Sequence, residues 1–255
     1  MSRKLGAILA GLCVLVPALA YAQTPEVKEK PAMYSYVSMW NYPRGQWGAV
    51  AKDRANDQKI LDKVVASGGI VAYGNDVNLV HQPDGFSHDD WWSSTSLAGV
   101  LNVLDQFYKS NSTISPLLVS ATKHSDLIFV SHHYNWKPGS YKDAYTRGAS
   151  YKFKPEVQEE ALGMLNKNLF EPLFEKLLAE GTIVEWEVDT EAVHTEAPGT
   201  FWVFYISPTA EGLDKTSAAV REVLKASPLS GPAFDSMVDW TAHRDYLART
   251  NAIYK

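Results

Sequence analysis

Residues 70–81 read IVAYGNDVNLVH, and residues 183–194 read IVEWEVDTEAVH. An Ile-Val pair, an aromatic residue, an aspartate and a closing Val-His pair recur in these stretches at a constant shift of 113 positions. Both stretches contain β-branched and aromatic residues, which favour strands. A strand repeated at this separation predicts that the chain contains two copies of one structural unit.

Three further pairs of segments occur in the same order along the chain. They are Tyr36-Val37-Ser38 with Phe129-Val130-Ser131, Trp91-Trp92 with Phe201-Trp202, and Thr122-x-His124-x-Asp126 with Thr241-x-His243-x-Asp245. We therefore predict an internal duplication, with a first repeat over residues 33–125 and a second over residues 126–255. The second repeat is longer mainly between Gly139 and Gly181, where we expect an extended first helix.

Hydrophobic periodicity predicts the same order of elements in both repeats. In the first repeat we expect strands at 33–42, 70–81, near Trp91 and at 117–121, with helices at 46–66 and 96–108. In the second repeat we expect strands at 127–134, 182–193, 200–207 and 236–241, with helices at 155–179 and 214–226. Pro172 should kink the longer of these helices, because proline cannot donate the interior hydrogen bond.

The order βαββαβ, occurring twice, is that of a ferredoxin-like unit in tandem. Such a unit carries both helices on one face of its sheet, so two units can bury their free faces against each other. The chain resembles the dimeric α+β-barrel superfamily in its duplicated, single-chain form. The predicted fold class is therefore α+β, with two repeats packed sheet to sheet as a pseudo-twofold barrel. The resemblance implies a choice among monooxygenases, haem-binding and chlorite-converting enzymes, haem-degrading proteins and isomerases, which fold analogy alone does not decide.

The N-terminus resembles a secretory signal peptide. Arg3 and Lys4 precede an apolar run from Leu5 to Leu19, and Ala20-Tyr21-Ala22 forms a small-x-small cleavage site. We expect cleavage after Ala22, a flexible segment at 23–32, and a periplasmic or secreted protein. The alternative is an uncleaved anchor, but the run is shorter than the roughly 20 residues that span a bilayer.

Charge and cysteine content narrow the function classes. The chain has 24 basic and 29 acidic side chains, and loss of Arg3 and Lys4 would leave a formal charge of −7. An acidic surface disfavours nucleic acid and, after signal cleavage, anionic membrane. The single cysteine, Cys13, lies inside the signal. The exported chain would therefore have no disulfide, thiol nucleophile or thiolate metal site.

Strand alternation predicts a ligand pocket in the barrel interior. We assign to the interior the aromatic and hydroxyl-bearing side chains of several strands, namely Tyr34, Tyr36, Ser38, Trp40, Trp92, Phe129, Ser131 and Trp202. Such a surface could hold a flat apolar ligand, or the barrel could be filled by its own side chains. His133 stands where the first repeat has Trp40, so it is the candidate catalytic base, or a haem or metal ligand. The alternative is a histidine at a strand end.

Other polar residues have competing interpretations. His81 and His194 end the second strands, and His124 with Asp126 and His243 with Asp245 end the fourth; retention in both repeats favours a structural role over catalysis. His88, Asp89 and Asp90 could bind a divalent cation, although a solvated loop is the favoured interpretation. For Glu185 and Glu187 an exposed sheet face is favoured over the interior.

The chain lacks H-E-x-x-H, G-x-S-x-G, G-x-G-x-x-G and a phosphate-binding glycine loop, which disfavours zincins, α/β-hydrolases and nucleotide-binding folds. The sequence favours an exported barrel that binds a small apolar or aromatic molecule, and it leaves catalysis open. An enzyme would be a cofactor-independent oxygenase, isomerase or lyase. The alternatives are a non-enzymatic structural protein that docks a partner through the extended helix at 156–180, as a homo-oligomer for example, and a haem-binding barrel with a histidine ligand.

Overall fold

The computed structural model describes residues 30–81, 85–158, 160–226 and 231–255. Within them, eight antiparallel strands form one closed barrel in the order β1-β3-β2-β8-β5-β7-β6-β4. The strands are β1 (Met33–Asn41), β2 (Ala72–Asn78), β3 (His88–Ser94), β4 (Lys123–Trp136), β5 (Gly139–Lys152), β6 (Glu185–Glu191), β7 (Thr200–Ser207) and β8 (Arg244–Tyr254).

The strand order consists of two ferredoxin-like sheets joined edge to edge. The first sheet is β4-β1-β3-β2 and the second is β8-β5-β7-β6, and the pairs β2–β8 and β6–β4 close the barrel. A closed barrel leaves no unpaired strand edge. The predicted α+β fold, built from two such repeats around a pseudo-twofold axis, is confirmed.

The division between the two units differs from the sequence expectation. β4 pairs with β1, with Phe129 opposite Ser35, so β4 is the partner of β1 and completes the first unit. The predicted boundary between residues 125 and 126 falls inside this strand. By strand order the second unit begins with β5.

The fourth strand of each repeat was predicted in the wrong place. Residues 117–121 fall mainly in the short helix α3 (Pro116–Val119), where the Ser115 hydroxyl accepts from the Leu118 amide and Pro116 occupies the first turn. In the predicted range 236–241, the first two residues end α7 (Gly231–Met237), and Val238 forms a single bridge with Phe153. Capping and a proline in the first turn outweigh the strand propensity of a short apolar run.

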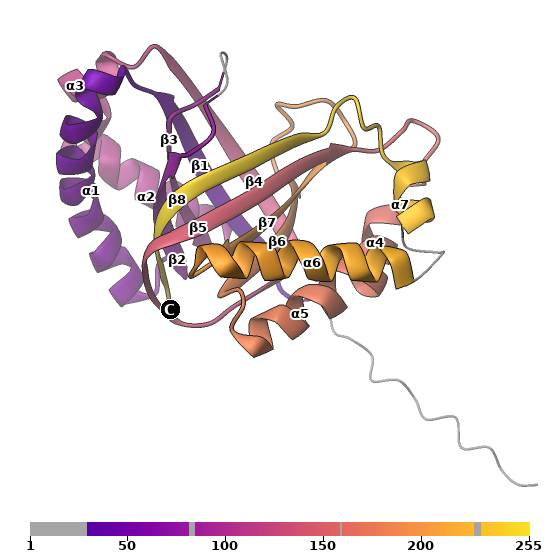
Figure 1. Ribbon diagram of the computed structural model, residues 1–255. Helices are drawn as coiled ribbons and strands as arrows, with labels where there is room; N and C mark the ends of the chain where they lie inside the picture. The colour runs from indigo at the N-terminus through magenta and orange to yellow at the C-terminus, as the bar shows by residue number, and fades with distance from the viewer. Residues whose placement is uncertain (1–29, 82–84, 159, 227–230) are drawn as a thin grey trace, which may run out of the picture.

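The helices cover the outside of the barrel in two groups (Figure 1). The first group is α1 (Trp47–Ser67), α2 (Leu97–Ser110) and α3, with short 3₁₀ turns at Arg44–Gln46 and Ser112–Ile114. The second group is α4 (Ala161–Leu165), the π-helical turn η3 (Asn166–Phe170), α5 (Glu171–Glu180), α6 (Ala210–Ala226) and α7. No helix among the described residues is long and apolar enough to span a membrane.

The long helix of the second unit starts later than predicted and is interrupted. It begins at Ala161 instead of Pro155, and the π-helical turn comes immediately before α5, whose first turn contains Pro172. Proline has no amide hydrogen, so the regular pattern is interrupted near the expected kink.

The repeat is also visible at the helix ends. Gly68 ends α1 with φ +78°, and Gly181 ends α5 with φ +75°, 113 positions later. Only glycine adopts this left-handed conformation at little cost, so both helices end in the same way. The helices then bury the outward side chains of their own sheets in two separate apolar cores, one around Val100 and Val103 and one around Trp186 and Phe201.

Candidate ligand site in the barrel interior

A cavity of about 180 Å³ lies inside the barrel and is lined by residues from all eight strands. β1 contributes Ser35, Val37 and Met39 to it. Successive side chains of a strand point to opposite faces, so Tyr36 points outward, where its ring stacks on Trp92 at 4.6 Å under α1 and α2. The predicted assignment of the two faces of β1 is therefore wrong.

The predicted pocket residues divide between the two sides of the barrel wall. Phe129 and Trp202 line the cavity, and Ser131 is buried beside it, donating to the Val188 carbonyl at 2.8 Å. The other five lie on the helix-covered face of β1 and β3, where Tyr36, Ser38, Trp40 and Trp92 line a second pocket of about 330 Å³ and Tyr34 packs in the same apolar core. The smaller side chains of β1 face the narrow interior, and the aromatic rings of β1 lie on the face that the helices cover.

The apolar walls of the cavity are mainly aromatic. Trp91, Phe129, Trp202 and Phe204 line it, and the rings of Phe129 and Trp202 lie 4.9 Å apart. Trp91 packs directly over Gly74, where a Cβ atom would overlap the indole ring and lie 2.8 Å from the Asn251 carbonyl oxygen. This part of the wall therefore requires glycine at position 74.

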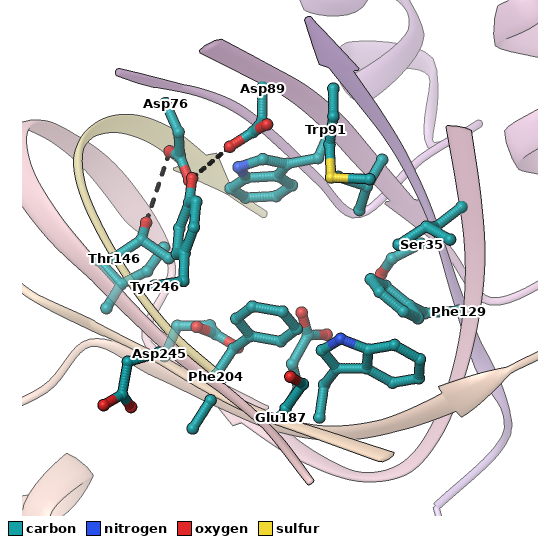
Figure 2. A pocket seen from close by; sticks show the side chains of 18 of the residues that line it. Ser35, Asp76, Asp89, Trp91, Phe129, Thr146, Glu187, Phe204, Asp245 and Tyr246 are labelled. Carbon is teal, nitrogen blue, oxygen red and sulfur yellow. Dashed lines mark hydrogen bonds between the residues drawn. The ribbon is translucent and has the colours of Figure 1, made fainter. Parts of the chain in front are cut away.

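Four polar side chains meet on one wall of the cavity (Figure 2). The Tyr246 hydroxyl lies 2.9 Å from Asp76 Oδ2 and 2.5 Å from Asp89 Oδ2. The Thr146 hydroxyl donates to Asp76 Oδ1 at 3.4 Å. A phenol has one hydrogen, so Tyr246 can donate to only one of the two carboxyls. The second contact is a hydrogen bond only when the other carboxyl is protonated and donates to the phenol oxygen.

Burial supports the sharing of a proton within this group. It raises the pKa of Asp89 to about 7, with the neighbouring Asp76 charge as the next largest cause. Burial also raises the pKa of Asp76, and it raises that of Tyr246 well above the usual range, so the phenol keeps its hydrogen. A carboxyl with a pKa near neutrality can both accept and return a proton under physiological conditions.

β6 adds further acidic residues to the interior. Glu185 and Glu187 line the cavity, while the intervening Trp186 packs beneath the helices. The favoured expectation of an exposed face for these glutamates is therefore wrong. Burial raises the pKa of Glu187 to about 7 and that of Glu185 well above its usual range. Asp189, on the same face of β6, is 1% exposed, and burial raises its pKa as well.

The polar group occurs once although the fold is duplicated. The shift of 113 positions relates Asp76 to Asp189 and Asp89 to Trp202. The shift of 119 between His124 and His243 relates Leu127 to Tyr246. The same shift of 113 aligns Trp91 with Phe204, whereas the sequence comparison paired it with Phe201. The Asp76–Asp89–Tyr246 group therefore has no copy at the equivalent positions, which hold Asp189, Trp202 and Leu127.

Comparison with known proteins adds information on the fold. No family model matches the chain, and no curated protein matches it. Two similar solved structures are proposed monooxygenases. That from Lactobacillus acidophilus NCFM has 9% identity and a TM-score of 0.64, covering 86% of this chain and 94% of its own. That from Fusobacterium nucleatum subsp. nucleatum ATCC 25586 has 8% identity and a TM-score of 0.66, with coverages of 89% and 95%.

The chain has a closed α+β-barrel fold, which it shares with these two structures. A variant of chlorite dismutase from Candidatus Nitrospira defluvii is also similar, with 12% identity and a TM-score of 0.52, covering 86% of this chain and 91% of its own. At these identities the comparisons establish the fold, and the chemistry of this α+β barrel has to be argued from its own residues.

The barrel cavity does not fit a haem. No histidine is among the residues that line it, and its walls carry several carboxyl groups, which would repel the propionates. His133 lies outside the cavity because a β-bulge shifts the register of β4 between Ser131 and His133. A bulge exchanges the two faces of a strand. His133 thus faces a separate groove of about 420 Å³, where its Nδ1 lies 3.5 Å from Glu171 Oε2.

The His88-Asp89-Asp90 segment is part of strand β3 and not a solvated loop. His88 is buried against Tyr42 and Trp47, and burial lowers its pKa to about 3. It points to the outer face, whereas Asp89 points into the cavity, so the segment cannot place its side chains around one cation. Among the described residues no group of three or more His, Cys, Asp and Glu is arranged to hold a metal ion.

The paired histidines have contacts that attach strands to one another. At the start of β4, His124 stacks on Trp40 at 3.6 Å and lies 3.0 Å from Asp126 Oδ1. At the start of β8, His243 stacks on Tyr151 at 4.6 Å and lies 3.5 Å from Asp245 Oδ1. Both histidines lie at the beginnings of the fourth strands and not at their ends, where they were predicted. His81 and His194 are exposed beyond the ends of β2 and β6.

Proposed function

We propose that this α+β barrel is an exported protein that binds a small, flat, largely apolar molecule in its interior and transfers protons on that molecule without a cofactor. The observation that carries the proposal is the Asp76–Tyr246–Asp89 group, which faces a cavity with aromatic walls. Sequence reasoning pointed instead to His133, which lies on the other side of the barrel wall.

The size of the cavity limits the ligand. An engineered protein cavity of about 150 Å³ holds a benzene molecule, so a cavity of about 180 Å³ suits a single ring with a short substituent. Trp91, Trp202 and Phe204 supply flat apolar surfaces for such a ring. Specificity would come from the few polar groups on the wall.

The acidic group can perform proton transfer that needs no further reactant. Ionised Asp89 removes a proton from a C–H bond next to a carbonyl group of the ligand, and the electron pair of that bond moves into an enolate. Protonated Asp89 then returns the proton to another atom of the ligand. Tyr246 keeps its hydrogen and orients the carboxyl. The net reaction of these two proton transfers is an isomerisation, which is the reaction class that the site supports best.

The proposal is tested by hydrogen exchange on single-ring aryl ketones in D₂O, followed by NMR. We expect the protein to accelerate exchange at the carbon beside the carbonyl group of at least one ketone. Asp89→Asn should slow this exchange at least 100-fold, in the range usual for loss of a general base. Asp105→Asn, on the exposed side of α2, removes the same charge and should leave the rate unchanged.

Two results would contradict the catalytic proposal. One is equal exchange by Asp89→Asn and the unmodified protein. The other is binding of the ketones without exchange, which would leave a binding protein.

Residues 1–22 lie outside the described residues, so export rests on the signal-like sequence. Mass spectrometry of protein from the exported fraction should give a chain that begins at Gln23.

A further inference from the structure

The cavity contains many more carboxyl groups than positively charged groups. Asp76, Asp89, Glu185, Glu187 and Asp245 line it. Of the described basic residues, Arg244 lies at its rim and donates to the carbonyls of Thr241 and His243. The charge balance of the wall is therefore strongly negative whenever these acids are ionised.

The interior is also short of hydrogen-bond donors. Asp89 is 4% exposed, and its Oδ1 has no hydrogen-bond partner among the described residues, nor has either carboxyl oxygen of Asp189. Burying an ionised carboxylate without a donor is costly, so a complementary ligand has to bring donors with it. Asp89 lines the cavity, and Figure 2 shows its carboxyl group on the cavity wall.

The aromatic walls fit the same kind of ligand. Trp91 and Trp202 line the cavity with the carboxyls, and the faces of tryptophan rings attract cations. Carboxylates beside such rings form a site for a charged head group on an apolar body. A hydrated metal ion would use only the carboxyls and leave the rings without a role.

We propose that the ligand of this cavity is a small organic cation, a primary ammonium or an amidinium carried on a single apolar ring, with its N–H groups donating to Asp89 and the neighbouring interior acids. This inference rests on the proposed binding function, since it names the class of molecule that enters the same cavity. It also gives a reason for an acidic interior that ketone chemistry alone does not require.

The inference predicts that binding is linked to protons. The titratable groups that line the cavity with Asp89 are Asp76 on β2, Glu185 and Glu187 on β6, and Asp245, Tyr246 and Tyr254 on β8. Asp90 and Arg54 approach from the outer face, where Arg54 donates to the backbone carbonyls of Asp76 and Asp89. A bound cation favours ionised carboxyls, so binding should release protons and tighten as pH rises from 5.5 to 8.

The test compares benzylamine with benzyl alcohol, its neutral isostere, and with benzoate and Ca²⁺, by calorimetry and by tryptophan fluorescence, to which Trp91 and Trp202 of the cavity wall contribute. At pH 8 we expect benzylamine to bind at least tenfold more tightly than benzyl alcohol, and benzoate and Ca²⁺ not to bind. At pH 6.5 the heat of benzylamine binding should depend on the ionisation enthalpy of the buffer. Asp89→Asn should remove the preference for the amine and retain the alcohol, and Asp105→Asn should retain both.

The outcomes separate this inference from the proposed function. Equal affinity for benzylamine and benzyl alcohol would overturn the cation and leave binding of a small apolar molecule in place. Tight binding of Ca²⁺ that excludes benzylamine would overturn it in favour of a metal site. Failure of all four probes to bind would contradict both proposals. Thermal unfolding of Asp89→Asn checks that a lost preference does not reflect a loss of folding.

Discussion

Gly74 illustrates how one residue sets the shape of the cavity. It lies on β2 directly beneath Trp91, and the space that a Cβ atom would take is already filled by the indole and the Asn251 carbonyl. In the second half, the space that a Cβ atom on Gly148 would take is filled by the ring of Phe204. The two aromatic walls of the interior therefore depend on the absence of a side chain in the strands below them.

Gly74→Ala should destabilise the fold by about 1–3 kcal/mol, the usual cost of overpacking a well-filled interior. It should also push Trp91 into the cavity and weaken the binding of single-ring probes. Denaturant unfolding and tryptophan fluorescence measure the two effects. Gly163→Ala is the matched control, since nothing lies within 4 Å of its Cβ position in α4; it should be neutral or stabilise by up to about 1 kcal/mol. Equal stability of the two variants would contradict the packing argument.

At the scale of elements, the bulge in β4 decides which residues can reach the ligand. Leu127 and Phe129 face the cavity before it, and His133 faces the groove beside α4 and α5 after it. Lys30 and Lys167 share this groove with Glu160, Glu171 and Glu175, so the histidine lies among side chains of both charges. The strand thus separates the acidic interior from the histidine that the sequence favoured.

His133→Ala should leave the binding of cavity probes unchanged within twofold, because the barrel wall separates the imidazole from them. The loss in stability should be below about 1 kcal/mol, since its contact with Glu171 is a partly exposed pair. Calorimetry and denaturant unfolding measure both. A tenfold change in probe binding would return His133 to the ligand site. A Soret band on haem titration that disappears in His133→Ala would replace the proposal with haem binding in the groove.

For the whole molecule, the acidic interior has a consequence for stability. Asp89 and Glu187 have pKa values raised to about 7 from 3.8 and 4.5 in the folded protein. Between about pH 4 and pH 7 the folded state therefore binds more protons than the unfolded state. The free energy of unfolding falls as pH rises through this range and levels off above it.

We expect the melting temperature to be higher at pH 5 than at pH 8, and Asp89→Asn to reduce this difference by removing one of the groups that causes it. Scanning calorimetry at one-unit intervals from pH 5 to pH 8 measures both effects. Asp105→Asn, which changes an exposed carboxyl, should retain the full difference. A melting temperature that rises from pH 5 to pH 8 would show that the interior acids are ionised at little cost.

The sequence by itself determined the duplication, the α+β class and most of the helices and strands, because these follow from periodicity, propensity and a shift of 113 positions. It placed Phe129 and Trp202 correctly among residues of the interior. The tertiary structure alone decided which face of β1 points inward, since alternation defines two faces without saying which one the helices cover. It also decided where β4 changes face, and it brought Asp76, Asp89 and Tyr246 together from three strands. Closure of the barrel joins these residues across 170 positions of sequence, and no local pattern encodes a contact of that kind.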